Sequence, residues 1–471
     1  MQAQADDQVN MTLVSAIVAV ATIGGLLFGY DSGAVNGTQA GLKAAFVLDD
    51  TGLGFTVGCL LVGCAAGAFL AGRMADRFGR KRIMTLAAVL FLAGALVQGL
   101  TASHALFVVF RFLGGMAVGA ASVLSPAYIS EVAPAAIRGR LTSVQQVMII
   151  TGLTLAFVVN YLLAEAAGGS LGMVGGLPAW RWMYLAQAVP AVVFLLALQF
   201  IPESPRYLVV GGSEDQARQV LARLFGAATA DRRVAEIRAS FATDHRPRLA
   251  DVLARGTVLR PIVWAGLIIA VFQQFVGINV IFYYGETLWR LAGVSEQAAL
   301  ERNIVSGLVS IAACFVTMAL VDRIGRKPLL LIGSVGMALT LGAMSWAFAQ
   351  GTLDSSGALQ MAPQLGLVAV IAANLYVVFF NASWGPVMWV LLGEMFPNQL
   401  RGSALAVCGL AQWAANYAVV QSFPAMARGL GLAETYGFYT AGAVISFWLV
   451  RSFLEETKGK ELEQMEGWGG H

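Results

Sequence analysis

The chain has 471 residues, of which 58% are hydrophobic and only 12% are charged, and its mean hydropathy is +0.72. Soluble domains carry about 25% charged residues, so this composition excludes a soluble globular protein and predicts an integral membrane protein. The formal net charge is only +3 and no basic face is interleaved with aromatic residues, so nothing in the sequence indicates a nucleic-acid partner.

Twelve apolar runs of about 20 residues are present, and that length crosses a bilayer as a helix. They lie near residues 11–35, 53–72, 83–102, 105–130, 141–163, 180–201, 261–286, 303–321, 329–349, 365–392, 403–424 and 436–454. The polar N-terminus lacks the basic start of a signal peptide, so we expect the first run to be retained as a helix.

The fold is expected to be all-α, with residues 1–201 and 261–454 each forming a six-helix bundle. The polar interval 202–260 predicts a linker on the cytoplasmic side, and residues 455–471 a cytoplasmic tail. Within the linker, Ser213–Phe225 has the pattern of a short amphipathic helix with a serine N-cap.

An internal repeat supports two halves. Asp76-Arg-Phe-Gly-Arg-Lys-Arg82 after the second run recurs as Asp322-Arg-Ile-Gly-Arg-Lys-Pro328 after the eighth. Glu131, Pro134, Arg138 and Gly139 recur with the same spacing as Glu394, Pro397, Arg401 and Gly402. The copies are six helices apart, which indicates a parallel duplication about an axis along the membrane normal.

The repeated loops are expected to hold charged latches between neighbouring helices, with Gly72 and Gly79 providing tight turns. Glu131 with Arg138, and Glu394 with Arg401, would supply further latch partners. The predicted latch residues are Arg73, Asp76, Arg80, Glu131, Arg138, Asp322, Arg326, Glu394 and Arg401. The alternative is that these basic loops reflect membrane topology alone.

Basic residues also predict the orientation. With the N-terminus inside, cytoplasmic segments hold 24 of the 30 Lys and Arg, so both termini should be cytoplasmic. The compact loops suit a bacterial inner membrane. Asn36-Gly-Thr38 matches the glycosylation pattern but lies near a helix end, which makes it weak evidence.

Asp31 and Arg111 are the two charges placed well inside apolar runs, at similar depth near the outer side. Such charges are costly and by default indicate an ion path. A carboxylate that exchanges an arginine partner for a proton could couple proton entry to substrate movement. The alternative is a static ion pair that orders helix packing.

The stretch from Gln273 to Tyr284 places amide and phenol side chains inside an apolar run. Amides and phenols offer donors and acceptors without net charge, which suits a neutral polyhydroxylated ligand such as a sugar. Gly277 could break the helix so that Gln273 and Asn279 face one cavity. Alternatively, these groups only join neighbouring helices. Amide and aromatic groups from three other runs could join them, namely Gln146, Trp384, Gln412 and Trp413. Trp384 begins Trp384-Gly-Pro386, which interrupts the tenth run.

Together these residues resemble the sugar porter family of the major facilitator superfamily, most closely bacterial proton-coupled xylose or glucose symporters. The motifs, over nearly the whole chain, are Gly29-Tyr-Asp31, Gly72-Arg73 to Arg80, Arg111-Phe-Leu-Gly-Gly115, Pro202-Glu-Ser-Pro-Arg206, Gln273-Gln-Phe-Val-Gly-Ile-Asn279, Trp384-Gly-Pro386 and Ala411-Gln-Trp413. Ser310 departs from an Asn common in relatives, and Glu455 replaces the proline of the C-terminal family pattern.

The resemblance implies a monomer in which two bundles rock around a central sugar site, without a cofactor and with protons as the coupling ion. By that likeness, Asp31 carries the proton and Arg111 is its partner. The sugar ligands would be Gln146, Gln273, Gln274, Asn279, Trp384 and Gln412, with Tyr283 closing the outer side.

The leading hypothesis is proton-coupled import of a monosaccharide such as glucose or xylose. One competitor is a facilitative sugar uniporter, against which Asp31 argues because facilitative relatives have a neutral residue there. Another is a sugar sensor that does not transport. An enzyme is disfavoured, because no His, Cys or carboxylate cluster offers a nucleophile or metal site; the four cysteines all fall in apolar runs.

Overall fold

A computed structural model of the chain describes residues 9–134, 137–243, 252–254, 258–353, 359–396 and 398–457. Its first half forms α1 (Met11–Asn36), α2 (Gln39–Phe46), α3 (Asp50–Phe78), α4 (Arg80–Leu100), α5 (His104–Val132), α6 (Arg138–Ala167), α7 (Ala179–Leu185) and α8 (Ala188–Phe200). Strands β1 (Met173–Val174) and β2 (Leu177–Pro178) pair antiparallel between α6 and α7, with Met173 opposite Pro178.

The linker contains α9 (Pro205–Val210), α10 (Glu214–Phe225), α11 (Ala227–Thr243) and the antiparallel strands β3 (Leu253–Ala254) and β4 (Val258–Leu259). The helix predicted over Ser213–Phe225 is present as α10. However, the Ser213 side chain makes no capping hydrogen bond, contrary to the prediction. Glu214 and Asp215 occupy the first turn instead, where negative charge is favourable.

The second half forms α12 (Pro261–Phe275), α13 (Ile278–Leu291), α14 (Glu296–Ile324), α15 (Arg326–Ala349), α16 (Pro363–Asn381), α17 (Trp384–Met395), α18 (Asn398–Gly429) and α19 (Leu432–Phe453). Strands β5 (Thr352–Leu353) and β6 (Leu359–Gln360) pair antiparallel between α15 and α16. Polar side chains start several helices: Asp49 caps α3, Ser103 caps α5 and Ser295 caps α14.

Eleven segments of the described chain are long and apolar enough to cross a membrane. The twelfth predicted span is α19, whose 22 residues pack against α15 and α12. Three spans are built from two helices each: α7 with α8, α12 with α13 and α16 with α17. The prediction of an all-α membrane protein with twelve spans in two bundles is thereby confirmed.

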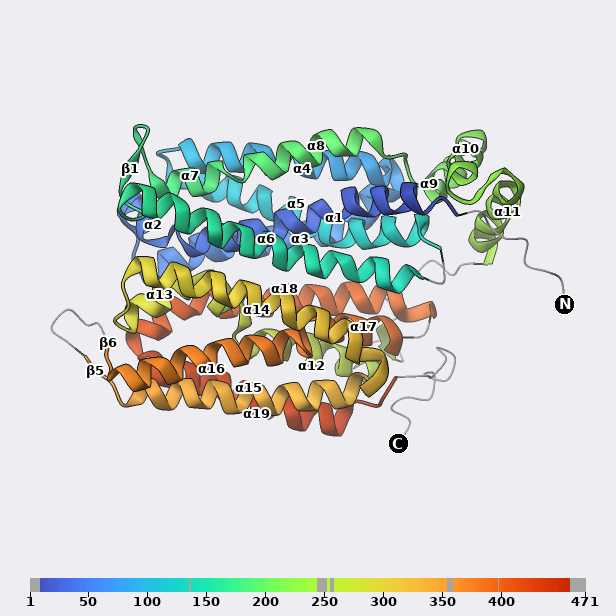
Figure 1. Ribbon diagram of the computed structural model, residues 1–471. Helices are drawn as coiled ribbons and strands as arrows, with labels where there is room; N and C mark the ends of the chain where they lie inside the picture. Colours follow the sequence, from blue (N-terminus) through green and yellow to red (C-terminus); the bar gives the residue numbers. More distant parts are fainter. Residues whose placement is uncertain are drawn as a thin grey trace.

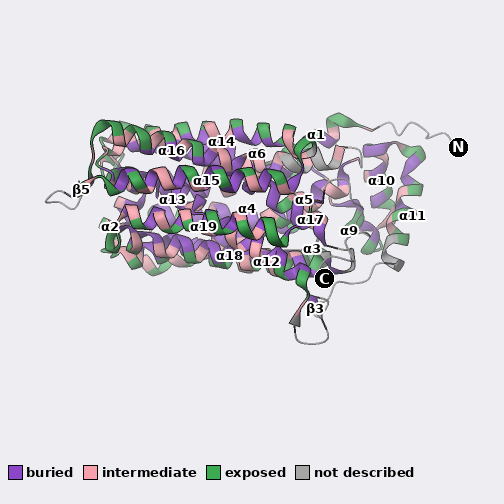
Figure 2. Ribbon diagram, turned by 90° about the horizontal axis from the view of Figure 1, so that it is seen from below, coloured by how far each residue is buried: buried purple, intermediate pink, exposed green. Residues whose placement is uncertain are grey.

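The two bundles lie side by side, α1–α8 in one and α12–α19 in the other (Figure 1). Strands β1–β2 and β5–β6 lie at one end of the bundles, the hairpin end, and α9–α11 lie at the opposite end, the linker end. Most spanning helices expose apolar residues on one side and bury the other, so buried and exposed residues alternate along them (Figure 2). The exposed apolar sides are those that would face lipid.

Glycine allows the closest helix contacts. A Cβ atom at Gly115 of α5 would lie 2.0 Å from the carbonyl oxygen of Leu60 on α3, so only a hydrogen fits there. Between the bundles, a Cβ at Gly54 of α3 would lie 2.3 Å from the carbonyl oxygen of Gln421 on α18. The bundles therefore meet at backbone distance along α3 and α18, and they also meet along α6 and α14.

Candidate functional site

The break in the seventh span falls at Gly277, as predicted. Gly277 has a φ of +83°, a left-handed conformation that favours glycine. The ring of Tyr439 on α19 covers it, with a nearest atom 2.8 Å from where a Cβ would be. The break ends α12 just after Gln273 and Gln274, and it starts α13 just before Asn279.

Gln273 is 3% exposed and lies at the centre of an amide network. Its Nε2 donates to the backbone carbonyl of Trp384 at 3.1 Å. Its Oε1 accepts from Gln412 Nε2 at 3.2 Å and from Gln274 Nε2 at 3.0 Å. Helices α12, α17 and α18 thus converge on one side chain.

The network continues through Asn279, which donates to Gln274 Oε1 at 2.6 Å and to Asn416 Oδ1 at 2.9 Å. Asn416 was not predicted from the sequence, although it follows Gln412 by four residues and therefore lies on the same helix face. The buried Oε1 of Gln412 has no hydrogen-bond partner among the described atoms. It is an acceptor free to receive a hydroxyl.

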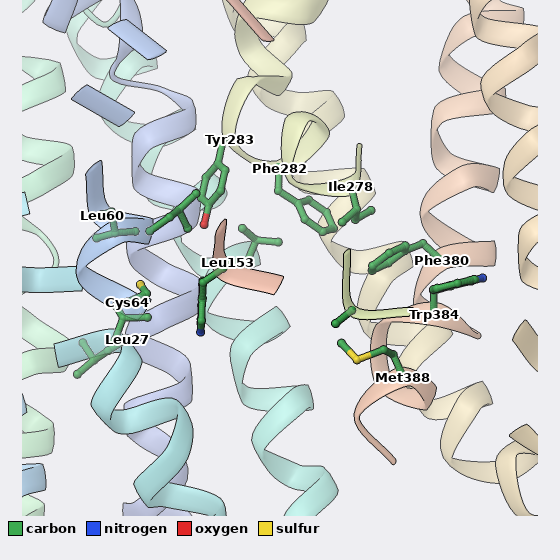
Figure 3. Packing of buried hydrophobic residues seen from close by; sticks show 14 of the residues in the cluster. Leu27, Leu60, Cys64, Leu153, Ile278, Phe282, Tyr283, Phe380, Trp384 and Met388 are labelled. Carbon is green, nitrogen blue, oxygen red and sulfur yellow. The ribbon is translucent and has the colours of Figure 1, made fainter. Parts of the chain in front are cut away.

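The side chains of Trp384 and Gln146 stand apart from this network. The Trp384 indole donates to the Leu330 carbonyl at 3.1 Å and to Ser334 Oγ at 3.0 Å, so its N–H is directed into α15. The Trp384 side chain is buried beside Met388 and Phe380 (Figure 3). Gln146 on α6 is half-buried, and it makes no hydrogen bond with the part of the chain that the structure describes. Ser310 Oγ donates to the Ser306 carbonyl within α14.

Asp31 and Arg111 come together, as the sequence suggested. Arg111 Nη1 lies 3.2 Å from Asp31 Oδ1 and 3.4 Å from Gln98 Oε1, and its guanidinium lies 5.9 Å from the Tyr184 ring centroid. Asp31 is 3% exposed and Arg111 is fully buried. Asp31 Oδ2 and Arg111 Nε and Nη2 have no hydrogen-bond partner among the described atoms, so this pair is only partly satisfied.

The residue after Asp31 connects this pair to the other bundle. Ser32 Oγ and the Tyr283 hydroxyl are 3.2 Å apart, which joins α1 to α13. In Figure 3 the Tyr283 hydroxyl points toward the first bundle, where Leu60 and Cys64 lie, whereas Phe282 and Ile278 point toward Phe380. Tyr283 is thus one of the α13 residues that reach across the interface, as is Thr287, which donates to Gln39 Oε1.

A polar cluster at the hairpin end closes the interface further. Asn36 Nδ2 donates to the Phe282 carbonyl at 2.8 Å, and Asn36 Oδ1 accepts from Glu286 N at 3.1 Å and Asn303 Nδ2 at 2.7 Å. Gln39 Nε2 donates to the Tyr283 carbonyl. Asn36 is fully buried, which agrees with giving its glycosylation pattern little weight. The hydrogen bonds described here that join the bundles gather at this end.

The first repeated motif forms an ion cluster at the linker end. Arg80 Nη2 lies 2.8 Å from Asp76 Oδ1 and 3.2 Å from Glu131 Oε1. Gly79, with a φ of +101°, makes the turn that places Arg80 against the end of α5. Gly72 lies inside α3, so its predicted role in a turn is wrong. Arg73 is exposed and its guanidinium packs over Phe69.

The second motif repeats this geometry. Arg326 donates to Glu394 through Nε at 3.0 Å and through Nη2 at 2.8 Å. Glu131 pairs with Arg80 and Glu394 with Arg326, because the turns after α3 and α14 place those arginines at the ends of α5 and α17. The contributions expected from Arg138 and Arg401 stay predictions. The side chains of Arg138, Asp322 and Arg401 lie outside the described part of the chain.

Two glutamates that the sequence analysis did not single out complete these clusters. Glu203 Oε1 accepts from the backbone N–H groups of Arg80 and Lys81 at 2.9 and 3.1 Å. Glu456 accepts from those of Arg326 and Lys327 at 3.0 and 2.9 Å. Each carboxylate therefore caps the N-terminus of α4 or α15. The sequence did contain a signal for Glu203, because this residue lies in the motif Pro202-Glu-Ser-Pro-Arg206.

Comparison with known proteins agrees with this architecture. Residues 17–467 match the family model described as "Sugar (and other) transporter". The chain is 45% identical over 458 residues to a glucose transport protein of Synechocystis sp., covering 97% of each chain. It is 38% identical over 491 residues to a D-xylose-proton symporter of Escherichia coli, covering 98% of this chain and 96% of the relative. A solved inward-open conformation of the xylose transporter XylE from E. coli superimposes with a TM-score of 0.82 at 36% identity, covering 96% of this chain and 99% of that one.

Proposed function

The chain belongs to the sugar transporter family, so it is a transporter and not an enzyme, and from that premise we propose that it imports a monosaccharide together with a proton. The names of its relatives, a glucose transport protein and a D-xylose-proton symporter, support a hexose or pentose as the substrate. Protons would be the coupling ion, and no other cofactor is invoked.

The observation that carries the proton coupling is the position of Asp31. It is buried beside Arg111 and precedes Ser32, whose hydroxyl meets Tyr283 of the opposite bundle. A proton on Asp31 removes the attraction between the carboxylate and the guanidinium. That change occurs one residue away from a contact that must break when the bundles separate at the hairpin end.

The sugar would bind at the amide network of Gln273, Gln274, Asn279 and Gln412. Each of these amides can both donate and accept, so sugar hydroxyls can replace amide partners without leaving buried groups unpaired. Trp384 would offer its ring face, and Gln146 would approach from the other bundle. This arrangement favours a sugar that bridges the bundles.

Transport would proceed by alternating access. In the conformation described, Tyr283 and the cluster around Asn36 close the hairpin end. Breaking those contacts would open the site on that side. The Arg80 and Arg326 clusters at the linker end, already formed in this conformation, would rearrange as the bundles rock. The excess of Lys and Arg in the segments on the linker side supports a cytoplasmic location for that end and for both termini. A monomer contains every residue invoked.

The test is to add single sugars to a weakly buffered suspension of de-energised cells that express the protein. Glucose, xylose, galactose and arabinose are compared, with cells carrying an empty vector as the control. Alkalinisation of the medium with one sugar identifies both the substrate and proton coupling. Entry of labelled sugar without a pH change would support the uniporter instead and leave Asp31 a structural role.

A further inference from the structure

A groove outside the central interface lies at the hairpin end of the second bundle. Its volume is about 430 Å³, and residues from the loop after α13, from α14 and from the start of α16 line it. The lining includes Val294, Met361, Pro363, Leu367 and Val370, together with one charged residue, Arg302. The hairpin β5–β6 lies at the same end (Figure 1).

Arg302 is the feature that gives this groove a chemical preference. Its guanidinium packs 5.0 Å from the ring centroid of Trp289, and it has no carboxylate partner in the described part of the chain. Arginine carries five donors and stays charged, so a partly desolvated guanidinium that lacks an anion is poorly satisfied. The groove therefore favours an anion.

Within the described residues, carboxylates on neighbouring turns do not supply that anion, because they already have partners. Glu286 pairs with Arg290 at 3.3 Å, Glu296 accepts from the backbone N–H of Ser170 at 2.7 Å, and Glu301 accepts from the Tyr161 hydroxyl at 3.3 Å. The positive charge at the groove is thus available to a molecule from outside the chain.

The apolar part of the groove continues onto the outer surface of the bundle. Leu367 is 60% exposed, and Ile371, one turn further along α16, is 51% exposed. Val305 and Leu308 are similarly exposed on α14. On spanning helices such surfaces face hydrocarbon, while Arg and Trp near the helix ends lie at the depth of lipid headgroups. One molecule that matches both parts is a phospholipid with net negative charge.

We propose that this groove binds an anionic phospholipid, with its phosphodiester against Arg302 and an acyl chain along Met361, Leu367 and Val370. Space for the lipid extends to Gly366, where an added Cβ would meet nothing within 4 Å. The first turn of α16 adds partial positive charge that favours an anion. Its N-cap residue, Ala362, has no side chain that could accept from the backbone N–H groups there.

The test uses the full-length protein purified in a non-ionic detergent and titrated with dioleoyl-phosphatidylglycerol or dioleoyl-phosphatidylcholine, with bound lipid counted by native mass spectrometry. The acyl chains are identical, so only the headgroup differs. The wild type should bind one phosphatidylglycerol with a Kd about tenfold lower than that for phosphatidylcholine, as expected for one charge-assisted contact.

Three variants separate the parts of the groove. Arg302→Gln should remove the preference for phosphatidylglycerol, and Arg302→Lys should retain most of it. Gly366→Leu should fill the groove and weaken binding of both lipids while Arg302 remains in place. Arg181→Gln and Gly429→Leu are matched controls: Arg181 also packs on a tryptophan but donates to backbone carbonyls, and Gly429 has equally open space on another helix.

The proposal is overturned if the wild type binds both lipids equally, or if its preference survives both Arg302→Gln and Gly366→Leu. It is also overturned if sn-glycerol 3-phosphate alone, at the same concentration, displaces phosphatidylglycerol completely, because the site would then recognise a free phosphate. Loss of the preference for phosphatidylglycerol in Arg302→Gln, with the preference retained in both controls, supports the proposal. If Arg302→Gln does not fold, Arg302→Lys and Gly366→Leu decide: the first should keep most of the preference, and the second should bind both lipids more weakly.

Discussion

Asn36, the last residue of α1, donates its side-chain amide to the backbone carbonyl of Phe282 on α13, at 2.8 Å. The bond ties the end of one bundle's first helix to the other bundle's broken seventh span. Because Asn36 also accepts from Glu286 N and from Asn303, one side chain makes three of the hydrogen bonds that close the hairpin end.

Asn36→Ala should therefore loosen the hairpin end. A lost buried hydrogen bond costs about 0.5–1.5 kcal/mol, so exchange of the backbone amides of α13 should accelerate about tenfold. Hydrogen exchange of residues 278–291 measures this effect. Asn160→Ala is the matched control, because buried Asn160 bonds to Gly33 and Ala34 within its own bundle. Equal acceleration in both variants would mean general destabilisation.

Asp31→Asn should abolish uphill accumulation of sugar and spare exchange of internal for external sugar. The amide keeps the shape of the side chain but stays neutral, so it cannot take up and release a proton. Accumulation of labelled sugar and counterflow in membrane vesicles separate the two activities. Asp215→Asn, at an exposed residue of α10, is the control. Wild-type accumulation in Asp31→Asn would exclude the coupling role.

Gln273→Ala should weaken monosaccharide binding by about 1–3 kcal/mol, or about five- to 150-fold in Kd, since the central amide of the network is lost. Titration calorimetry with the transported sugar measures the change. Gln199→Ala removes an amide that is exposed on α8 and should leave the Kd unaltered. If Gln273→Ala binds with wild-type affinity, the network only joins helices.

Glu203→Ala and Glu456→Ala should each destabilise the protein by about 0.5–2 kcal/mol, because each leaves two backbone N–H groups of a helix start without their acceptor. The two carboxylates cap helices of different bundles, so the losses should add in the double variant. Unfolding of the purified protein in denaturant gives these values. Strong non-additivity would show that the two clusters are coupled.

Local patterns in the sequence were enough to predict some features of the candidate site. The break at Gly277 is one such feature. It depends only on neighbouring residues, a glycine within an apolar run followed by a polar Asn. The meeting of Asp31 with Arg111 is another, because each charge has a depth fixed by its distance from a helix end. The roles assigned to Gln146 and Trp384 stay predictions.

The contact of Glu131 with Arg80 could not be predicted, although the repeat that contains both was visible. It depends on the turn at Gly79, which presents Arg80 to that carboxylate. Asn416 and Asn36 were missed for a related reason. A single polar residue in an apolar run does not indicate which way it faces until the rotation of its helix is known.

The sequence by itself determined the class of protein, the twelve spans and the duplication of the halves, because hydropathy and repeated motifs are written in contiguous residues. The tertiary structure decided which polar groups meet: Gln273 with Trp384, Asn36 with Phe282, and Glu456 with the start of α15. These contacts join residues more than 100 positions apart, and they depend on the rotation, depth and crossing of packed helices. Apolar composition leaves those three quantities open.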